Sequence, residues 1–211
     1  MADQHQAGCQ RDYGRYGRKQ DGARSHHRFA LVKLGHHEGA GADLRVRELM
    51  PDALENDLKN GVIDIAISFP GSESSRFKTR PLLREPLGLV LPERHPLAKS
   101  RKIAVKDLAQ ERFLIVPRDQ ASSLRQSIVQ CCRAAGFDPI IGLEVYLQQT
   151  IVNFVAEGLG IAFVPASMQR SQIKGAVFRK VDNPPMIDRL LCWSLANKNP
   201  CLARFLTLSE R

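Results

Sequence analysis

The clearest alternation of apolar and polar positions in the chain lies between Leu147 and Met168 (LQQTIVNFVAEGLGIAFVPASM). Ile151, Phe154 and Val155 recur at the spacing of one helical face. Gly158 follows at the point where a left-handed residue ends a helix without a Cβ penalty. This part of the segment therefore predicts an amphipathic helix with a glycine stop.

The same segment continues into an uninterrupted apolar run over residues 161–164 (IAFV), which is typical of a strand buried on both faces. Pro165 ends that run, and Ser167 is expected to cap the helix that follows. Small ligands bind at the carboxyl ends of strands in open α/β sheets. The segment therefore predicts one edge of a ligand site.

A second regular stretch begins at residue 44. Residues 44–49 (LRVREL) alternate as a strand does, and Pro51 opens a helix with a leucine stripe. Residues 62–67 (VIDIAI) then form a buried strand, which makes a β-α-β unit with parallel strands.

Similar patterns continue to the C-terminus. We expect strands at 78–83, 87–91, 113–116, 140–145, 177–181 and 190–195, and helices at 105–109, 122–135 and 202–208. Strands that alternate with helices indicate an α/β fold with a mostly parallel sheet.

Residues 1–43 have a different character. They hold five of the six histidines and many Gly, Gln and Arg residues, and only residues 29–34 (FALVKL) look capable of burial. This composition is typical of a disordered segment. We expect an atypical segment up to residue 43 and a folded part after it.

Composition limits the function classes. The chain of 211 residues has no apolar run of about 18 residues and no apolar core near its start, which predicts neither a membrane span nor a secretory signal. The five cysteines are odd in number and lack a CxxC spacing, which favours a reducing cytoplasmic compartment. The net charge of +9 suggests nucleic-acid binding. The basic residues are dispersed, however, and aromatic residues make up only 6% of the chain, which favours an ordinary basic surface.

Catalytic and metal chemistry are poorly supported. His95 and Cys131 are far apart, and Cys131 lies in a helical pattern where cysteine usually packs as a small hydrophobe. The adjacent pairs His26-His27 and His36-His37 lack the i, i+4 spacing of a helical metal site. No GxGxxG, P-loop or GxSxG motif occurs. We expect no catalytic residue, no metal and no cofactor.

Four phrases together resemble the effector-binding domain of LysR-type transcriptional regulators. They are LKNGVIDIAI (58–67), LLREPLGLVLPERHPLA (82–98), AAGFDP (134–139) and VAEGLGIAFVPASM (155–168). Their order and spacing match the family over residues 44–211. The VPASM wording looks closest to regulators of aromatic-compound catabolism.

The resemblance implies a type-2 periplasmic-binding-protein-like α/β fold, in which two crossover strands, here 87–91 and 190–195, join two α/β subdomains. Subdomain I would comprise 44–90 plus 190–211, and subdomain II 91–189. A small effector, anionic and in the narrower expectation aromatic, would bind in the cleft between them. The family also implies a homodimer through this domain and a tetramer in full-length relatives.

The predicted effector site collects the loops and helix starts that face this cleft. Arg118 would pair with an anionic effector, whereas Pro51 and Ser68 have the alternative roles of helix starter and ordinary loop serine. Ser122 and Ser123 would donate hydroxyls or cap their helix. The predicted site residues are Met50, Pro51, Ser68, Pro117, Arg118, Ser122, Ser123, Gln148, Gln149, Thr150, Val164, Pro165 and Ala166.

Two other functions remain open at this point. A free-standing small-molecule-binding protein would share the fold, but such proteins usually carry the secretory signal that is not found here. An α/β enzyme would also share it, but no nucleophile or paired catalytic carboxylates stand out. The sensing domain of a regulator therefore remains the main expectation.

The sequence departs from the family at its beginning. Residues 1–43 do not show the pattern of the helix-turn-helix through which full-length relatives bind DNA, nor that of the expected first strand and helix. We hypothesise that this segment comes from a shifted reading frame or a misplaced start. Translation of the neighbouring frames of the gene should then yield an alternating strand followed by an amphipathic helix, and the hypothesis fails if no frame does.

Overall fold

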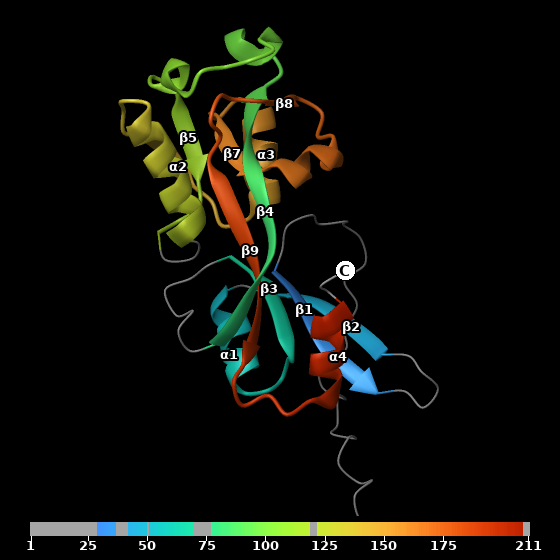
Figure 1. Cartoon of the computed structure of the whole chain (residues 1–211). Helices are drawn as coiled ribbons and strands as arrows, with labels where there is room; N and C mark the ends of the chain where they lie inside the picture. The colour runs from blue at the N-terminus through green and yellow to red at the C-terminus, as the bar shows by residue number, and fades with distance from the viewer. Residues whose placement is uncertain (1–28, 37–41, 50, 70–76, 119–121, 209–211) are drawn as a thin grey trace, which may run out of the picture.

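Two long strands, β4 (Phe77–Pro92) and β9 (Met186–Ser194), connect the two lobes of the computed structural model (Figure 1). The structure describes residues 29–36, 42–49, 51–69, 77–118 and 122–208. The strands pair antiparallel from Phe77 opposite Ser194 to Pro86 opposite Met186. Ile187 belongs to the core of the upper lobe and Leu190 to that of the lower lobe, so the chain crosses between these residues.

The lower lobe is built on the end of one sheet. It contains β1 (Phe29–His36), β2 (Ala42–Leu49), α1 (Pro51–Lys59), β3 (Ile65–Ser68) and α4 (Pro200–Leu208). The strand order is β2-β1-β3-β9-β4-β7, with β1 antiparallel to both of its neighbours. The expected strands β2 and β3 therefore run parallel, but β1 lies between them.

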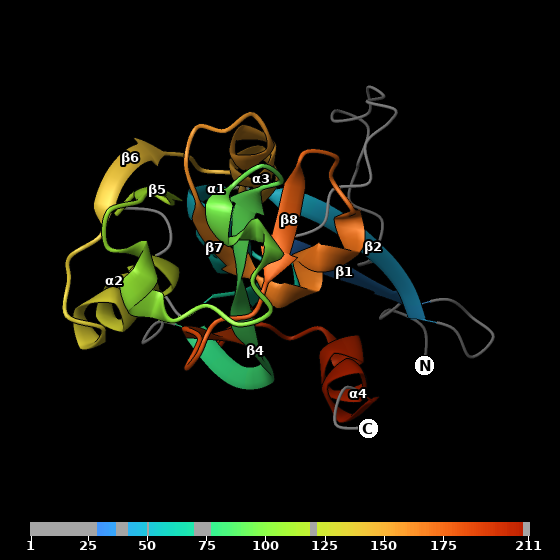
Figure 2. The same ribbon diagram turned by 90° about the horizontal axis from the view of Figure 1, so that it is seen from above.

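The upper lobe packs helices around β4 and a second sheet. Its elements are η2 (Pro96–Lys99), η3 (Val105–Leu108), β5 (Arg112–Ile115), α2 (Ser122–Ala134), β6 (Ile140–Glu144), α3 (Gln148–Ala156), β7 (Ala162–Pro165), η4 (Ala166–Ser171) and β8 (Ala176–Arg179). Seen from above, β5, β6 and α2 lie on one side of β4 and β8 on the other (Figure 2).

Three expectations about the strands are corrected. Residues 78–83 and 87–91 belong to a single strand, with a register shift between Pro81 and Leu83. Residues 87–91 pair with β7 and β8 inside the upper lobe, so the crossing lies just before them. The sheet is also not mostly parallel, because β4 pairs antiparallel with β7, β8 and β9, whereas β5 and β6 are parallel.

The segment before residue 43 also needs a correction. Residues Phe29–His36, which we expected to lie in an atypical segment, form β1 and hydrogen-bond to both β2 and β3. The apolar positions of 29–34 supply the strand pattern that its polar surroundings obscured. The histidine pair 26–27 lies outside the described residues.

The segment around Gly158 and Gly160 follows its prediction closely. Helix α3 ends at Ala156, Gly158 has a φ of 81°, and all of β7 is buried. Gly160 has a φ of 151°, and a Cβ there would overlap the Arg112 carbonyl oxygen and lie 2.6 Å from Leu114 Cδ1. The missing side chain lets Ile161 bond to β5, with its N–H 2.8 Å from the Arg112 oxygen.

Substitution of Gly160 should therefore be costly for two reasons, backbone strain and steric overlap. We expect Gly160→Ala to lower the free energy of unfolding by about 3 kcal/mol. Gly136→Ala is the matched control, because Gly136 has a φ of 94° with nothing within 4 Å of an added Cβ. It should cost only about 1 kcal/mol. Urea unfolding measures both values, and equal losses would contradict the close approach of β5.

Two cysteines are packed into the cores as small hydrophobic side chains. Cys132 on α2 and Cys192 on β9 are buried and free. Burial, with the charges of Cys131 and Asp138 adding to it, raises the pKa of Cys132 to about 12. Burial and the nearby Glu55 raise the pKa of Cys192 to about 11.

These two thiols should resist alkylation, because the thiolate is the reactive form and little of it exists at pH 8 when the pKa is raised. We expect iodoacetamide to modify Cys132 and Cys192 at least ten-fold more slowly in the folded chain than in urea, where thiol pKa values return to about 8.5. Peptide mass spectrometry gives each rate separately. Rates in the folded chain equal to those in urea would show that these packed cores open freely.

Candidate functional site

The loop after β5 and the start of α2 form the first part of the predicted site. Pro117 is buried and Arg118 is exposed. Ser123, in the first turn of α2, has a fully enclosed Oγ with no hydrogen-bond partner among the described residues. Met50 and the side chains of Pro51 and Ser122 lie outside the described part of the chain.

The start of α3 forms the second part. Gln148 is the first residue of this helix and is only 6% exposed, and its Oε1 has no partner among the described residues. Gln149 and Thr150 are half-buried. No side-chain hydrogen bond caps the helix at Leu147. The two helices thus each begin with an enclosed polar atom whose hydrogen-bonding capacity is not used within the described structure.

The end of β7 lies deeper than a cleft wall would. Val164 and Pro165 are buried and pair with Gly88 and Leu87 of β4. Val164 belongs to the core of the upper lobe, and of these neighbours only Ala166 is half-exposed.

Ser167 does not cap η4, because Pro165 occupies the cap position and makes no side-chain bond. Its hydroxyl instead donates to Glu85 Oε2 at 2.7 Å, and its N–H donates to the same oxygen at 3.0 Å. The expected capping role of Ser167 is therefore wrong.

Ser68 lies at the end of β3, where the two lobes meet. Its hydroxyl donates to the Phe69 carbonyl oxygen at 3.2 Å. The Phe69 ring packs against the core of the upper lobe, and the Arg189 guanidinium lies 5.8 Å from its centroid. Ser68 is therefore held at the joint of the lobes.

Glu85 is a functional candidate that sequence analysis missed. It is 5% exposed, and its Oε1 lies 2.8 Å from Arg189 Nη2. That contact has the distance of an ion pair but not the direction of a hydrogen bond, and the buried Arg189 Nε has no partner among the described residues. Glu85 thus connects β4, β9 and, through Ser167, η4.

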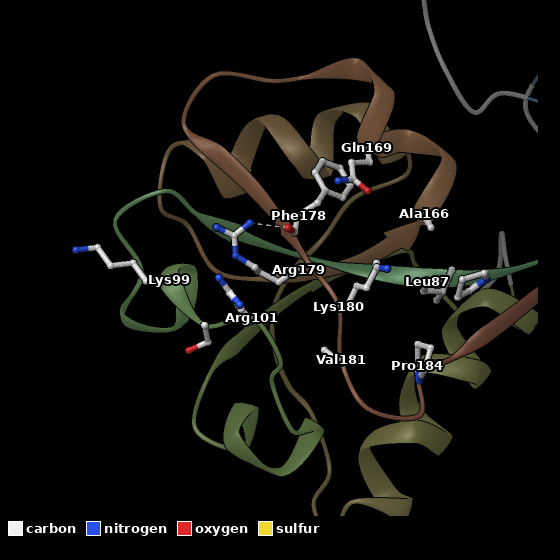
Figure 3. Close-up of a pocket in the computed structure, with 13 residues that line it drawn as sticks. Leu87, Lys99, Arg101, Ala166, Gln169, Phe178, Arg179, Lys180, Val181 and Pro184 are labelled. Atoms are coloured by element: carbon white, nitrogen blue, oxygen red, sulfur yellow. Dashed lines mark hydrogen bonds between the residues drawn. The ribbon is translucent and has the colours of Figure 1, made fainter.

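A cavity of about 610 Å³ opens elsewhere, between β4, η2, η4 and β8 (Figure 3). Of the predicted site residues that the structure describes, only Ala166 lines it. Its basic residues are Lys99, Arg101, Arg179 and Lys180, and its apolar wall includes Leu87, Phe178, Val181 and Pro184. No sequence motif indicated this site, because its residues come from distant segments.

Other chemistry finds little support in the described part of the chain. No group of three or more His, Cys, Asp or Glu side chains there is placed to hold a metal ion. His95 contacts Glu111 at 3.2 Å, and its Nδ1 accepts the Leu97 N–H, so it closes the turn of η2. In the same residues no helix has the length and apolar character to cross a membrane.

Comparison with proteins of known sequence gives a consistent family. The family model described as LysR substrate binding domain matches residues 30–210. The chain is 28% identical over 168 residues to the HTH-type transcriptional regulator AlsR of Bacillus subtilis, covering 79% of this chain and 56% of that protein. It is 31% identical to CatR of Pseudomonas putida, covering 64% and 52%. The chain thus spans about half the length of these relatives.

Solved structures agree with this fold. The reduced form of OxyR superposes with a TM-score of 0.63 at 27% identity, covering 78% of this chain and 76% of that one. CbnR, at 18% identity, gives a TM-score of 0.70 and covers 78% and 57%. The effector-binding domain of QuiR in complex with shikimate gives 0.66 at 23% identity, covering 76% and 77%.

These structural neighbours have the type-2 periplasmic-binding-protein-like fold of LysR regulatory domains, a mixed α/β fold that the present structure shares. The family model extends the similarity from residue 44, where the quoted phrases began, back to residue 30 within β1. The chain belongs to the LysR substrate-binding domain family, whose members are ligand-sensing parts of transcriptional regulators.

Proposed function

We propose that this chain senses a small anionic effector, preferably aromatic, in the cytoplasm and thereby controls transcription. The effector occupies the cleft between the lobes, at the starts of α2 and α3. The observation that carries this proposal is the pair of enclosed polar atoms, Ser123 Oγ and Gln148 Oε1, that have no partner among the described residues.

Physical chemistry favours a polar ligand at these atoms. An enclosed polar atom without a partner costs about 1–3 kcal/mol, so a ligand or water that bonds to it is stabilised. The first turns of α2 and α3 also present free N–H groups and partial positive charge, which favour a carboxylate. Exposed Arg118 adds a cation next to the start of α2.

A known complex supports the chemical class. The QuiR domain, which shares this fold, holds shikimate, a hydroxylated carboxylate. A ligand of that kind offers both the anion that a helix start attracts and hydroxyl donors that Gln148 Oε1 accepts. We therefore propose an effector that carries a carboxylate and at least one donor group.

The joint between the lobes is the proposed route of the signal. Phe69 of the lower lobe and Arg189 of β9 meet beside Glu85 and Ser167. A ligand held between the lobes would change the angle at this joint and, in a homodimer, the distance between attached DNA-binding domains. DNA would be contacted through a helix-turn-helix domain, as the names of the relatives indicate, and no catalytic step is proposed.

A ligand screen with matched variants tests the site. We expect one or more of shikimate, benzoate, salicylate and 4-hydroxybenzoate to raise the melting temperature of the chain and to bind by calorimetry. Ser123→Ala and Gln148→Met should each weaken that binding about ten-fold, because each removes one hydrogen bond to a charged or polar ligand. Without ligand, Ser123→Ala should not be less stable, since Ser123 Oγ has no partner among the described residues.

Ser171→Ala is the matched control, because Ser171 Oγ is equally enclosed and without a partner among the described residues but lies on η4. It should leave ligand affinity within two-fold of the unsubstituted chain. Equal affinity in Ser123→Ala, Gln148→Met and the control would refute the proposed site. Turnover of any of these compounds would refute the function.

A further inference from the structure

A cavity of about 610 Å³ lies beside β8, apart from the predicted effector cleft (Figure 3). It lies within the upper lobe and shares only Ala166 with the predicted cleft. Pockets for small molecules in proteins typically measure about 300–1,000 Å³. The volume therefore suits a small organic molecule with a ring or a short chain.

The charged side chains that line this cavity are all positive. Lys99, Arg101, Arg179 and Lys180 line it, and no carboxylate is among its lining residues. Two acids are adjacent in sequence to lining residues, and neither lines the cavity: Asp182 lies 2.8 Å from Lys102, and Glu85 is engaged by Arg189 and Ser167. A concave surface lined by charges of one sign concentrates ions of the opposite sign. The positive potential of the cavity therefore favours the binding of anions.

One of the four cations is fixed in place. Arg179 sits opposite Leu89 in the pairing of β8 with β4. Its Nε donates to the Ala98 carbonyl oxygen at 2.6 Å. Its Nη1 donates to the Phe178 oxygen at 2.7 Å (Figure 3). These two bonds leave Nη2 unused within the described structure. A guanidinium held in this way binds a carboxylate or phosphate with little loss of side-chain entropy.

The floor of the cavity is apolar and open. Gly88 of β4 lies there without a side chain, and a Cβ built on it would be 3.5 Å from the Phe178 ring and 3.8 Å from Ala166 Cα. Leu87 and Val181 continue this surface. A flat ring fits such a floor, because an aromatic or aliphatic wall stabilises it by apolar burial.

We propose that this cavity is a second, separate binding site for a small aromatic dianion, such as an aromatic dicarboxylate or an aryl phosphate. The anionic groups bind Arg179, Arg101 and Lys180, and the ring packs on Gly88 and Phe178. Because Gly88 lies three residues from Glu85 on β4, the occupied site contacts the same strand that forms the joint between the lobes. The chain would thus respond to two ligands.

Calorimetry on the full chain with phthalate and phenyl phosphate tests this site. We expect millimolar or tighter binding of at least one probe. The double substitution Arg101→Gln with Lys180→Gln should weaken it at least ten-fold. Arg94→Gln with Lys106→Gln is the matched control, because it removes one Arg and one Lys that are exposed and do not line the cavity. The control should stay within two-fold of the unsubstituted chain.

Two further variants separate the parts of the proposal. Gly88→Val should weaken binding of phenyl phosphate but not of inorganic phosphate, because it fills the floor and spares the cations. Ser123→Ala should leave unaffected the binding that Arg101→Gln with Lys180→Gln removes, which distinguishes this site from the cleft. The proposal is overturned if neither probe binds, if the two double variants bind equally well, or if Ser123→Ala abolishes binding.

Discussion

The pairing of β4 with β9 is the constraint on which the rest of the structure depends. These two strands connect the two lobes. Their register brings Glu85 opposite Ile187, at the point where the chain passes from one lobe to the other. There the buried Glu85 carboxylate meets Arg189 and accepts two hydrogen bonds from Ser167. A buried carboxylate is costly unless it is paired and hydrogen-bonded, so these partners hold η4 and β9 at fixed positions relative to β4.

Because of this arrangement, three consecutive parts of β4 have different roles. Glu85 forms the joint, Leu87 and Gly88 form the floor of the basic cavity, and Leu89 to Leu91 are buried in the core of the upper lobe. A strand that is hydrogen-bonded on both sides does not move one residue independently of the next. Under the proposal made above, ligand binding at the cavity and bending at the joint would therefore be mechanically related.

Local patterns predicted most elements because their causes are local. The apolar spacing of α3, the glycine with positive φ at Gly158 and the buried run of β7 all act within a few residues. The expected division into two strands, 78–83 and 87–91, was wrong for a local reason as well. Proline costs a strand only the hydrogen bond that its N–H would donate, so β4 passes through both Pro81 and Pro86 with one shift in register.

The sites were less predictable because their contacts join distant positions. Ser167 reaches Glu85 across 82 residues of sequence, and Arg179 reaches Ala98 across 81. Strand-end reasoning nominated Ser123 and Gln148, which depend on where a helix starts, but it assumed a parallel sheet around β7. In the antiparallel arrangement Val164 turns into the core, and the exposed concave surface forms beside β8 instead. The direction of strand pairing thus decides which residues can meet a ligand.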